Sequence, residues 1–205
     1  MMTLFNLYIF LLISFSYEID ESKTLIIYFS RAGENYSVGT VERGNTELIV
    51  DYLKEITKIK VFKIQPQIEY PVNYDETLKV VKNEQNINSR PQIIEPITNI
   101  DDYDTILLGY PVWYGHLPNI VKTQLELLNF EGKTIYPFNT HEGSETGNTI
   151  NEIKETVPKA IIKNGFPLEG QYARKKDSRK DIGKWLKEKL NINLDNHKNN
   201  DIDYL

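Results

Sequence analysis

Apolar runs of strand length alternate along the chain with apolar residues at helical spacing. Five runs predict strands at residues 24–29, 60–64, 105–109 and 134–138, and around 160–166. Four apolar stripes predict helices that contain Ile49, Val50, Leu53 and Ile56; Ile120, Val121, Leu125 and Leu128; Ile150, Ile153 and Val157; and Ile182, Trp185, Leu186 and Leu190. Residues 74–85, after a turn at Pro71, predict one further helix.

This alternation is typical of a doubly wound α/β fold, in which helices cover both faces of a parallel sheet. Two of the strand runs are almost continuously apolar, as expected for parallel strands that are buried on both faces. We therefore predict one domain at residues 23–190, preceded by an apolar segment at 1–22 and followed by a polar tail at 191–205.

Charge and cysteine content narrow the function. The 205 residues carry a formal charge of −5 without a basic cluster, which argues against a nucleic-acid partner. No cysteine is present, so disulfides, thiolate catalysis and cysteine-held iron–sulfur centres are excluded. The three histidines are spread along the chain without carboxylates at a matching spacing, which gives little support to a metal site. Redox chemistry would therefore need a bound cofactor.

The apolar run at residues 4–15 is short for a membrane span and has the form of a signal-peptide core, with a possible cleavage site after Ser16. The positive charge that usually precedes such a core is missing. A signal would place the protein in the secretory pathway or anchor it to a membrane, and Asn35-Tyr36-Ser37 would then be a possible glycosylation site. The alternative is an apolar extension that packs on a cytoplasmic domain. Any membrane contact would be made through this segment alone.

In a sheet of this kind, ligands bind beyond the carboxyl ends of the strands, where the strand order reverses. The loop at residues 30–45 leads into GTVERGNT, which has the spacing of a nucleotide-binding P-loop except that Asn45 stands where the lysine should be. Asn45 cannot supply the charge that NTP hydrolysis needs. The helix start at Gly44, Asn45 and Thr46 can nevertheless hold a monophosphate through neutral donors, helped by the Ser30 hydroxyl. Alternatively, it is a simple turn and helix cap.

The loop at residues 110–118 places Tyr110, Trp113 and Tyr114 directly after a buried strand. These aromatic side chains predict the wall of a pocket for a flat conjugated ring, although Trp113 could instead cap the core. His116 is expected to face solvent.

The loop at residues 139–147 is rich in hydroxyl, glycine and amide groups that can approach a planar ligand through the backbone. If Glu142 lies near a ring that becomes anionic on reduction, it lowers the reduction potential; otherwise it points to water.

Together these loops resemble the flavodoxin family, in the branch with an insertion in the phosphate loop, here residues 32–43. The similarity covers residues 23–190 and is carried by YFSRAGENY followed by GNT, YPVNYDETLKVVKNEQNINSRP, YDTILLGYPVWYGHLP and GKTIYPFNTHEGS. It implies a five-stranded sheet in the order 2-1-3-4-5 and an FMN cofactor; flavodoxin is itself the standard example of that strand order. Related sequences tend to have glycine at the position of Glu142.

The resemblance also implies which residues contact FMN. Those around the phosphate would be Ser30, Arg31, Gly44, Asn45 and Thr46. Those flanking the ring would be Pro111, Val112, Trp113, Tyr114 and Gly115 on one side, and Thr140, His141, Gly143 and Ser144 on the other.

The predicted function is electron transfer through FMN, with redox proteins as partners and no side chain needed as a catalytic acid or base. The alternative on the same fold is an NAD(P)H-dependent FMN reductase of quinones or small aromatics. A third possibility is a binding protein that kept the fold without the cofactor.

Overall fold

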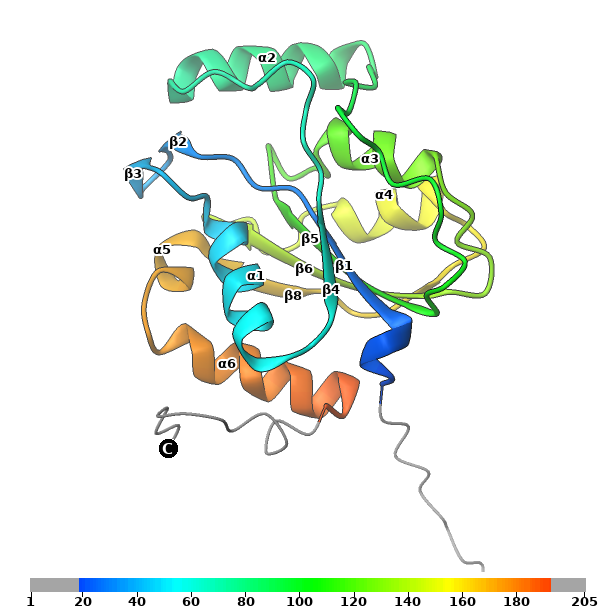
Figure 1. Cartoon of the computed structure of the whole chain (residues 1–205). Coiled ribbons are helices and arrows are strands. Elements are labelled where there is room, and N and C mark those ends of the chain that lie inside the picture. The colour runs from blue at the N-terminus through cyan, green and yellow to red at the C-terminus, as the bar shows by residue number, and fades with distance from the viewer. Residues whose placement is uncertain (1–18, 193–205) are drawn as a thin grey trace, which may run out of the picture.

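The computed structural model describes residues 19–192, which form a parallel sheet between two layers of helices (Figure 1). The sheet strands are β1 (Thr24–Tyr28), β4 (Lys60–Lys63), β5 (Thr105–Pro111), β6 (Thr134–His141), β7 (Ile161–Ile162) and β8 (Phe166–Glu169). The helices are α1 (Asn45–Ile56), α2 (Tyr74–Asn86), α3 (Asn119–Glu126), α4 (Thr149–Thr156), α5 (Gly170–Ala173) and α6 (Ser178–Trp185). A 3₁₀ turn covers Glu21–Lys23, and a π-helical turn, Leu186–Leu190, continues α6.

The sheet confirms the predicted α/β class. Its order is β4-β1-β5-β6-β7, β8 also pairs with β6, and every pair is parallel. The strand numbers differ from the predicted 2-1-3-4-5 because β2 and β3 form a separate hairpin. The predicted number of five strands is wrong, since the sheet has six.

The sixth strand arises because the run predicted around residues 160–166 is interrupted. β7 pairs with the start of β6, where Ile162 lies opposite Ile135, and β8 pairs with its end, where Phe166 lies opposite Phe138. Polar residues and a glycine at 163–165 separate the two segments. One predicted edge strand is therefore two short ones.

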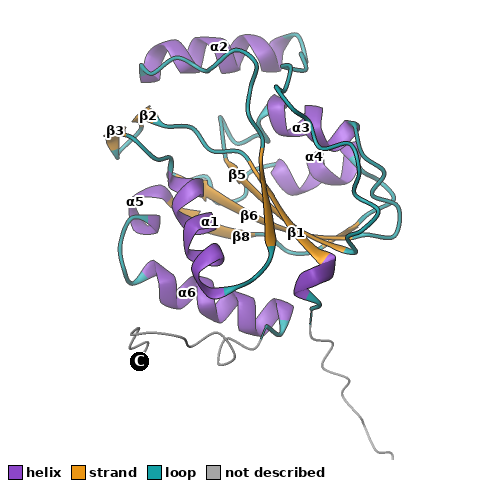
Figure 2. Ribbon diagram, viewed as in Figure 1, coloured by secondary structure: helices purple, strands orange, loops and turns teal. Residues whose placement is uncertain are grey.

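Alternating side chains of β1 enter two different cores. Ile26 and Tyr28 pack with α1 and α6, whereas Leu25 and Ile27, with Phe29 just after the strand, pack with α3 and α4. Figure 2 shows these helices on opposite sides of the strands. Burial on both faces accounts for the continuously apolar run in the sequence.

The helical stripes are found in helices, with shifted ends. α3 ends at Glu126, because the chain tightens into a turn where Leu127 N–H bonds to Gln124 O, so Leu128 lies beyond the helix. Val157 likewise caps α4 rather than extending it. The last stripe divides between α6 and the π-helical turn. The four-residue helix α5 was not predicted.

The segment predicted as a loop at residues 30–45 contains an antiparallel hairpin, β2 (Gly33–Asn35) and β3 (Gly39–Val41). Ser37, in its turn, has a left-handed φ of 59°. The hairpin and α2 lie on the same side of the sheet, near its carboxyl edge (Figure 1). Strands of three mostly polar residues carry no periodic apolar signal, so pattern analysis missed them.

The possible signal segment and its cleavage site lie outside the described residues, as does most of the predicted tail. Between residues 19 and 192 there is no helix with the length and apolar character needed to cross a membrane.

Candidate functional site

A cavity of about 420 Å³ lies at the carboxyl ends of β1, β5 and β6. All three predicted loops contribute to its lining. Of the predicted FMN contacts, the cavity is lined by Ser30, Arg31, Asn45, Thr46, Pro111, Val112, Trp113, Tyr114, Gly115, Thr140, His141 and Ser144. Gly44 and Gly143 are outside the lining, although each belongs to a loop that reaches it. The fold therefore brings the predicted residues together, and their roles toward FMN stay predictions.

The polar end of the cavity is the N-terminus of α1. The first N–H groups of a helix have no acceptor within the helix and carry the positive end of its dipole. Here the Glu47 N–H donates to Ser30 Oγ at 3.1 Å, and the hydroxyls of Thr46 and Thr140 are 2.8 Å apart. Amides and hydroxyls thus form a neutral cradle of the kind that binds phosphate.

Gly44 allows this cradle to close around the end of β1. A Cβ at position 44 would lie 2.3 Å from Ser30 Oγ and 2.4 Å from the Arg31 carbonyl oxygen. The φ of Gly44 is −69°, which any residue can adopt, so the position requires glycine for space. The donor set and its tight geometry fit a phosphate group.

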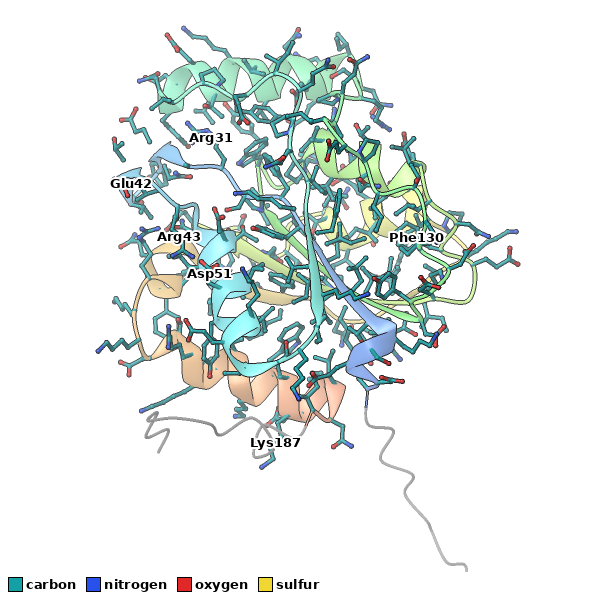
Figure 3. The ribbon with its side chains drawn as sticks, viewed as in Figure 1. Arg31, Glu42, Arg43, Asp51, Phe130 and Lys187 are labelled. Carbon is teal, nitrogen blue, oxygen red and sulfur yellow. The ribbon has the colours of Figure 1, made fainter. Side chains whose placement is uncertain are left out.

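Cations near the cradle are engaged with other protein groups. Arg43 forms an ion pair with Asp51 on α1 (Figure 3), and Lys63 pairs with Glu47 at 2.8 Å. Arg174, which follows α5, donates to Asn45 Oδ1 at 2.9 Å and to a loop carbonyl. In the described part of the chain these three cations are bound to protein groups, and hydrogen-bond donors take the place of the P-loop lysine.

Arg31 binds backbone carbonyls. Its guanidinium donates to Pro71 O at 2.7 and 3.1 Å, to Val72 O at 2.8 Å and to Glu34 O at 2.7 Å. Burial is the main reason that the pKa of Arg31 is lowered from its ordinary value, and the group stays charged. Figure 3 places Arg31 between the hairpin and α2. Arg31 joins the insertion to the chain that leads into α2. It lines the cavity, but its guanidinium donates to these carbonyls.

The β5 loop forms the aromatic wall. β5 and β6 run beyond their predicted ends, and Val112 N–H bonds to Thr140 O at 2.8 Å, so the two loops are held together. The Trp113 ring packs edge-on against Phe29 and Tyr70, with centroids 5.4 and 4.9 Å apart. Trp113 also lines the cavity, so it combines the two roles that the sequence left open.

Glu152 of α4 anchors the far end of this loop. Its carboxylate accepts the Leu117 N–H at 2.7 Å, the Lys122 ammonium at 2.8 Å and His116 Nδ1 at 3.2 Å. Burial alone would raise the pKa of Glu152, but these donors outweigh it, led by the Leu117 N–H, and hold the pKa below its ordinary value. The His116 side chain is 46% exposed, in agreement with the predicted solvent-facing position, and its Nδ1 is in addition bound to Glu152.

The β6 loop is shaped by local hydrogen bonds. His141 is buried, and its Nδ1 accepts the Gly143 N–H at 3.1 Å. Asn139 donates to Glu145 O at 2.9 Å. These bonds hold the loop in place beside the cavity.

Glu142 lines the cavity, but its carboxylate is bound to α5. Its Oε1 accepts the Gln171 N–H at 3.2 Å, at the N-terminus of that short helix. A Cβ on Gly170 would lie 2.6 Å from the same oxygen and 2.2 Å from Asn45 Nδ2. Glu142 thus joins the β6 loop to α5 instead of pointing to water.

Part of the lining was missed by the sequence analysis. These residues come from the hairpin and α2, and they are Asn35, Tyr36, Tyr74, Thr77, Leu78 and Val81. The aromatic residues were visible, but nothing in their spacing showed that the insertion and α2 meet at the cavity. Across residues 19–192, no cluster of three His, Cys, Asp or Glu is placed to hold a metal ion.

The parallel sheet with a cavity at the carboxyl ends of its strands defines a flavodoxin-like α/β protein. The flavodoxin family model matches residues 23–189, and the chain belongs to this family. No curated protein matches it.

Solved structures support the same assignment. A protein designated a flavoprotein from Bacteroides uniformis is 26% identical, with a TM-score of 0.65 and coverage of 82% of this chain and 99% of that one. A second, from Bacteroides eggerthii, is 29% identical, with a TM-score of 0.61 and coverage of 80% and 96%. A Lactobacillus acidophilus flavoprotein solved with FMN shares the fold at 20% identity, with a TM-score of 0.58 and coverage of 80% and 98%.

Proposed function

We propose that this member of the flavodoxin family binds FMN in the cavity and acts as an electron-transfer protein. The observation that carries the proposal is that the two ends of the cavity differ. A neutral phosphate cradle lies at α1, and aromatic rings lie along the β5 loop. FMN has a phosphate at one end and a flat ring at the other. A volume of about 420 Å³ is within the range of small-molecule sites. Family membership and the likeness to two Bacteroides flavoproteins support this cofactor.

The chain's own groups bind and orient the cofactor. The α1 amides with the hydroxyls of Ser30 and Thr46 hold the phosphate, and the β5 and β6 loops flank the ring and exclude water from it. FMN, when bound, supplies one-electron and two-electron redox chemistry. No side chain has to act as a general acid or base.

The carrier's partner is expected to be a basic redox protein. The chain has a formal charge of −5, and Glu145 lies exposed on the loop beside the cavity. Long-range attraction would orient a basic partner toward this edge, and salt would weaken that attraction.

One observation favours a second candidate, an FMN-dependent NAD(P)H reductase of quinones or small aromatics. Tyr36 and Tyr114 line the cavity and yet are 60% and 53% exposed. Exposed aromatic rings at the cavity leave a place where a second flat molecule could stack. A carrier that exchanges electrons only with proteins has no need of such a place.

An anaerobic titration distinguishes the two candidates. The protein is loaded with FMN, mixed with stoichiometric NADPH and followed by absorbance at the flavin band. We expect the flavin to stay oxidised with NADPH alone and to be reduced when a basic flavodoxin reductase is added. Rapid bleaching by NADPH alone would replace the carrier proposal with the reductase.

A further inference from the structure

Three tyrosines from separate parts of the chain meet at one side of the cavity. Tyr36 lies at the tip of the β2–β3 hairpin, Tyr74 is the first residue of α2, and Tyr114 is in the β5 loop. The rings of Tyr36 and Tyr74 are stacked, with centroids 5.9 Å apart and planes inclined by 30°. Tyr114 lines the same cavity as these two rings. The pKa of Tyr74 is raised by its burial and further by the neighbouring Tyr114 and Tyr36 phenols. A phenol hydroxyl can donate a hydrogen bond.

Hydrogen bonds between the hairpin and the start of α2 hold the rings of Tyr36 and Tyr74 in place. Glu34 of the hairpin accepts the N–H of Tyr74 and the Asn73 side-chain amide, both at 3.0 Å. Its own N–H bonds to Val72 O at 2.8 Å. Arg31 donates to carbonyls on both sides of the same junction. The insertion is therefore fixed to the start of α2, and this contact determines the separation of Tyr36 and Tyr74.

The third ring is held by a strained backbone. Tyr114 has a φ of 53°, in the left-handed region that bulky residues rarely adopt. The flanking residues Trp113 and His116 close the turn with two backbone hydrogen bonds of 2.9 and 3.1 Å. Such strain persists where the surroundings enforce it, most often at functional sites.

Tyr36 and Tyr74 are additional to the residues that the FMN site requires, whereas Tyr114 belongs to the β5 loop that is also predicted to flank the FMN ring. The phosphate cradle and the two ring-flanking loops come from α1, β5 and β6, whereas Tyr36 and Tyr74 reach the cavity from the insertion and α2. Beside them, Leu78 and Val81 of α2 supply apolar lining. The cavity thus has a second side that is aromatic and apolar and carries phenol donors.

We propose that Tyr36, Tyr74 and Tyr114 form a subsite for a neutral, flat, electron-poor ring with carbonyl oxygens, that is, a molecule of the quinone class. The rings offer stacking surface and the phenols can donate to carbonyl oxygens. A nicotinamide dinucleotide fits less well, because its phosphates call for basic side chains. Arg31 is the only lysine or arginine in the described lining, and it is bound to carbonyls. This inference rests on the FMN binding proposed above and deepens the second candidate, the FMN-dependent reductase, since the ligand would lie beside the FMN ring.

The test is a calorimetric titration of 1,4-naphthoquinone into the protein, with oxidised FMN bound and also without FMN. Both partners are oxidised, so no electrons move and the readout is binding alone. We expect saturable binding that Tyr36→Ala weakens roughly 2- to 10-fold, the effect of one lost stacking partner, while Tyr36→Phe, which loses only the hydroxyl donor, weakens it less. Tyr114→Ala should weaken it similarly. Leu127→Ala, at a residue 51% exposed and outside the cavity lining, is the control.

The outcomes separate this inference from the proposed function. If the parent protein did not bind FMN, the proposed function would be refuted. FMN binding without naphthoquinone binding, or naphthoquinone binding that both alanine variants leave unchanged, would overturn the subsite alone. If Tyr36→Ala weakened FMN as much as naphthoquinone, the ring would belong to the cofactor site. If NADPH bound more tightly than naphthoquinone and the same tyrosine variants weakened it, the assignment of the subsite to quinones would be wrong.

Discussion

The two sides of the cavity are built by different means. The phosphate cradle uses backbone amides, two small hydroxyl side chains and a glycine that packs against Ser30, and Thr46 within it is 1% exposed. The tyrosine side uses three large rings, which come from the inserted hairpin, the start of α2 and the β5 loop. Two of them, Tyr36 and Tyr114, are more than half exposed. The cradle can recognise a fixed group with little adjustment. The tyrosine side suits a ligand that binds and dissociates in each cycle.

Replacing Gly44 by alanine should have the largest effect on the cradle. The added methyl meets Ser30 Oγ and the Arg31 carbonyl, so the loop must move and several phosphate donors are displaced together. Overpacking of this kind costs about 1–3 kcal/mol in stability, and we expect FMN affinity to fall by about 100-fold or more. Flavin fluorescence quenching measures the affinity. Gly132→Ala introduces strain at a remote positive φ and should lower the melting temperature without affecting FMN.

Removing the Thr46 hydroxyl should weaken the phosphate end alone. Thr46→Val deletes one hydrogen-bond donor and leaves Thr140 Oγ1 without its partner at 2.8 Å. We expect FMN affinity to fall about tenfold, the cost of a hydrogen bond to a charged group, while riboflavin affinity stays unchanged. Thr46→Ser keeps the hydroxyl and should restore most of the affinity. Equal losses for FMN and riboflavin would mean that Thr46 does not contact the phosphate.

The Glu152 anchor should make stability depend on acid pH. Its folded-state pKa is lowered from 4.5, so its contribution is present above about pH 4.5 and is lost as the pH falls through the folded-state value. Glu152→Gln should cost about 1 kcal/mol at pH 7 and reduce the loss of stability below pH 4.5. Urea unfolding between pH 3 and 7 measures this. Glu155→Gln, at an exposed position of the same helix, is the control, and an identical pH profile in both variants would refute the assignment.

The smallest effect concerns Glu142, whose carboxylate is bound to the N-terminus of α5. Glu142→Gly should raise the flavin reduction potential, because a negative charge beside the ring is removed. The change should stay below about 1 kcal/mol, the interaction of unit charges about 4 Å apart in bulk water. Glu142→Gln removes the charge but keeps the contact to Gln171. If only the glycine variant shifts the potential, the effect comes from loop geometry and not from charge.

The same contrast separates what the sequence could predict from what it could not. Parallel strands buried on both faces and amphipathic helices leave periodic apolar signals, so the α/β class and the three strand-end loops were predictable. Trp113 was recognisable because it comes shortly after a buried strand, and Gly44-Asn45-Thr46 because it has nearly P-loop spacing ahead of a predicted helix. The hairpin was not, since its strands have only three residues and little apolar content.

The tyrosine side was unpredictable for a related reason. Tyr36 and Tyr74 are brought together by the Arg31 and Glu34 contacts, which join residues about 40 positions apart. No periodicity encodes such a contact. Glu142 was noticed as a charge, but its partner Gln171 is 29 residues away in a short helix that itself gave no signal.

The central claim is that the cavity recognises FMN through a neutral phosphate cradle. The most direct measurement is a calorimetric titration of the cofactor-free protein with FMN and, in parallel, with riboflavin, which lacks the phosphate. We predict 1:1 binding of FMN that is at least about tenfold tighter than that of riboflavin, corresponding to one or more charged hydrogen bonds. Equal affinity for the two, or no binding of FMN, would contradict the account.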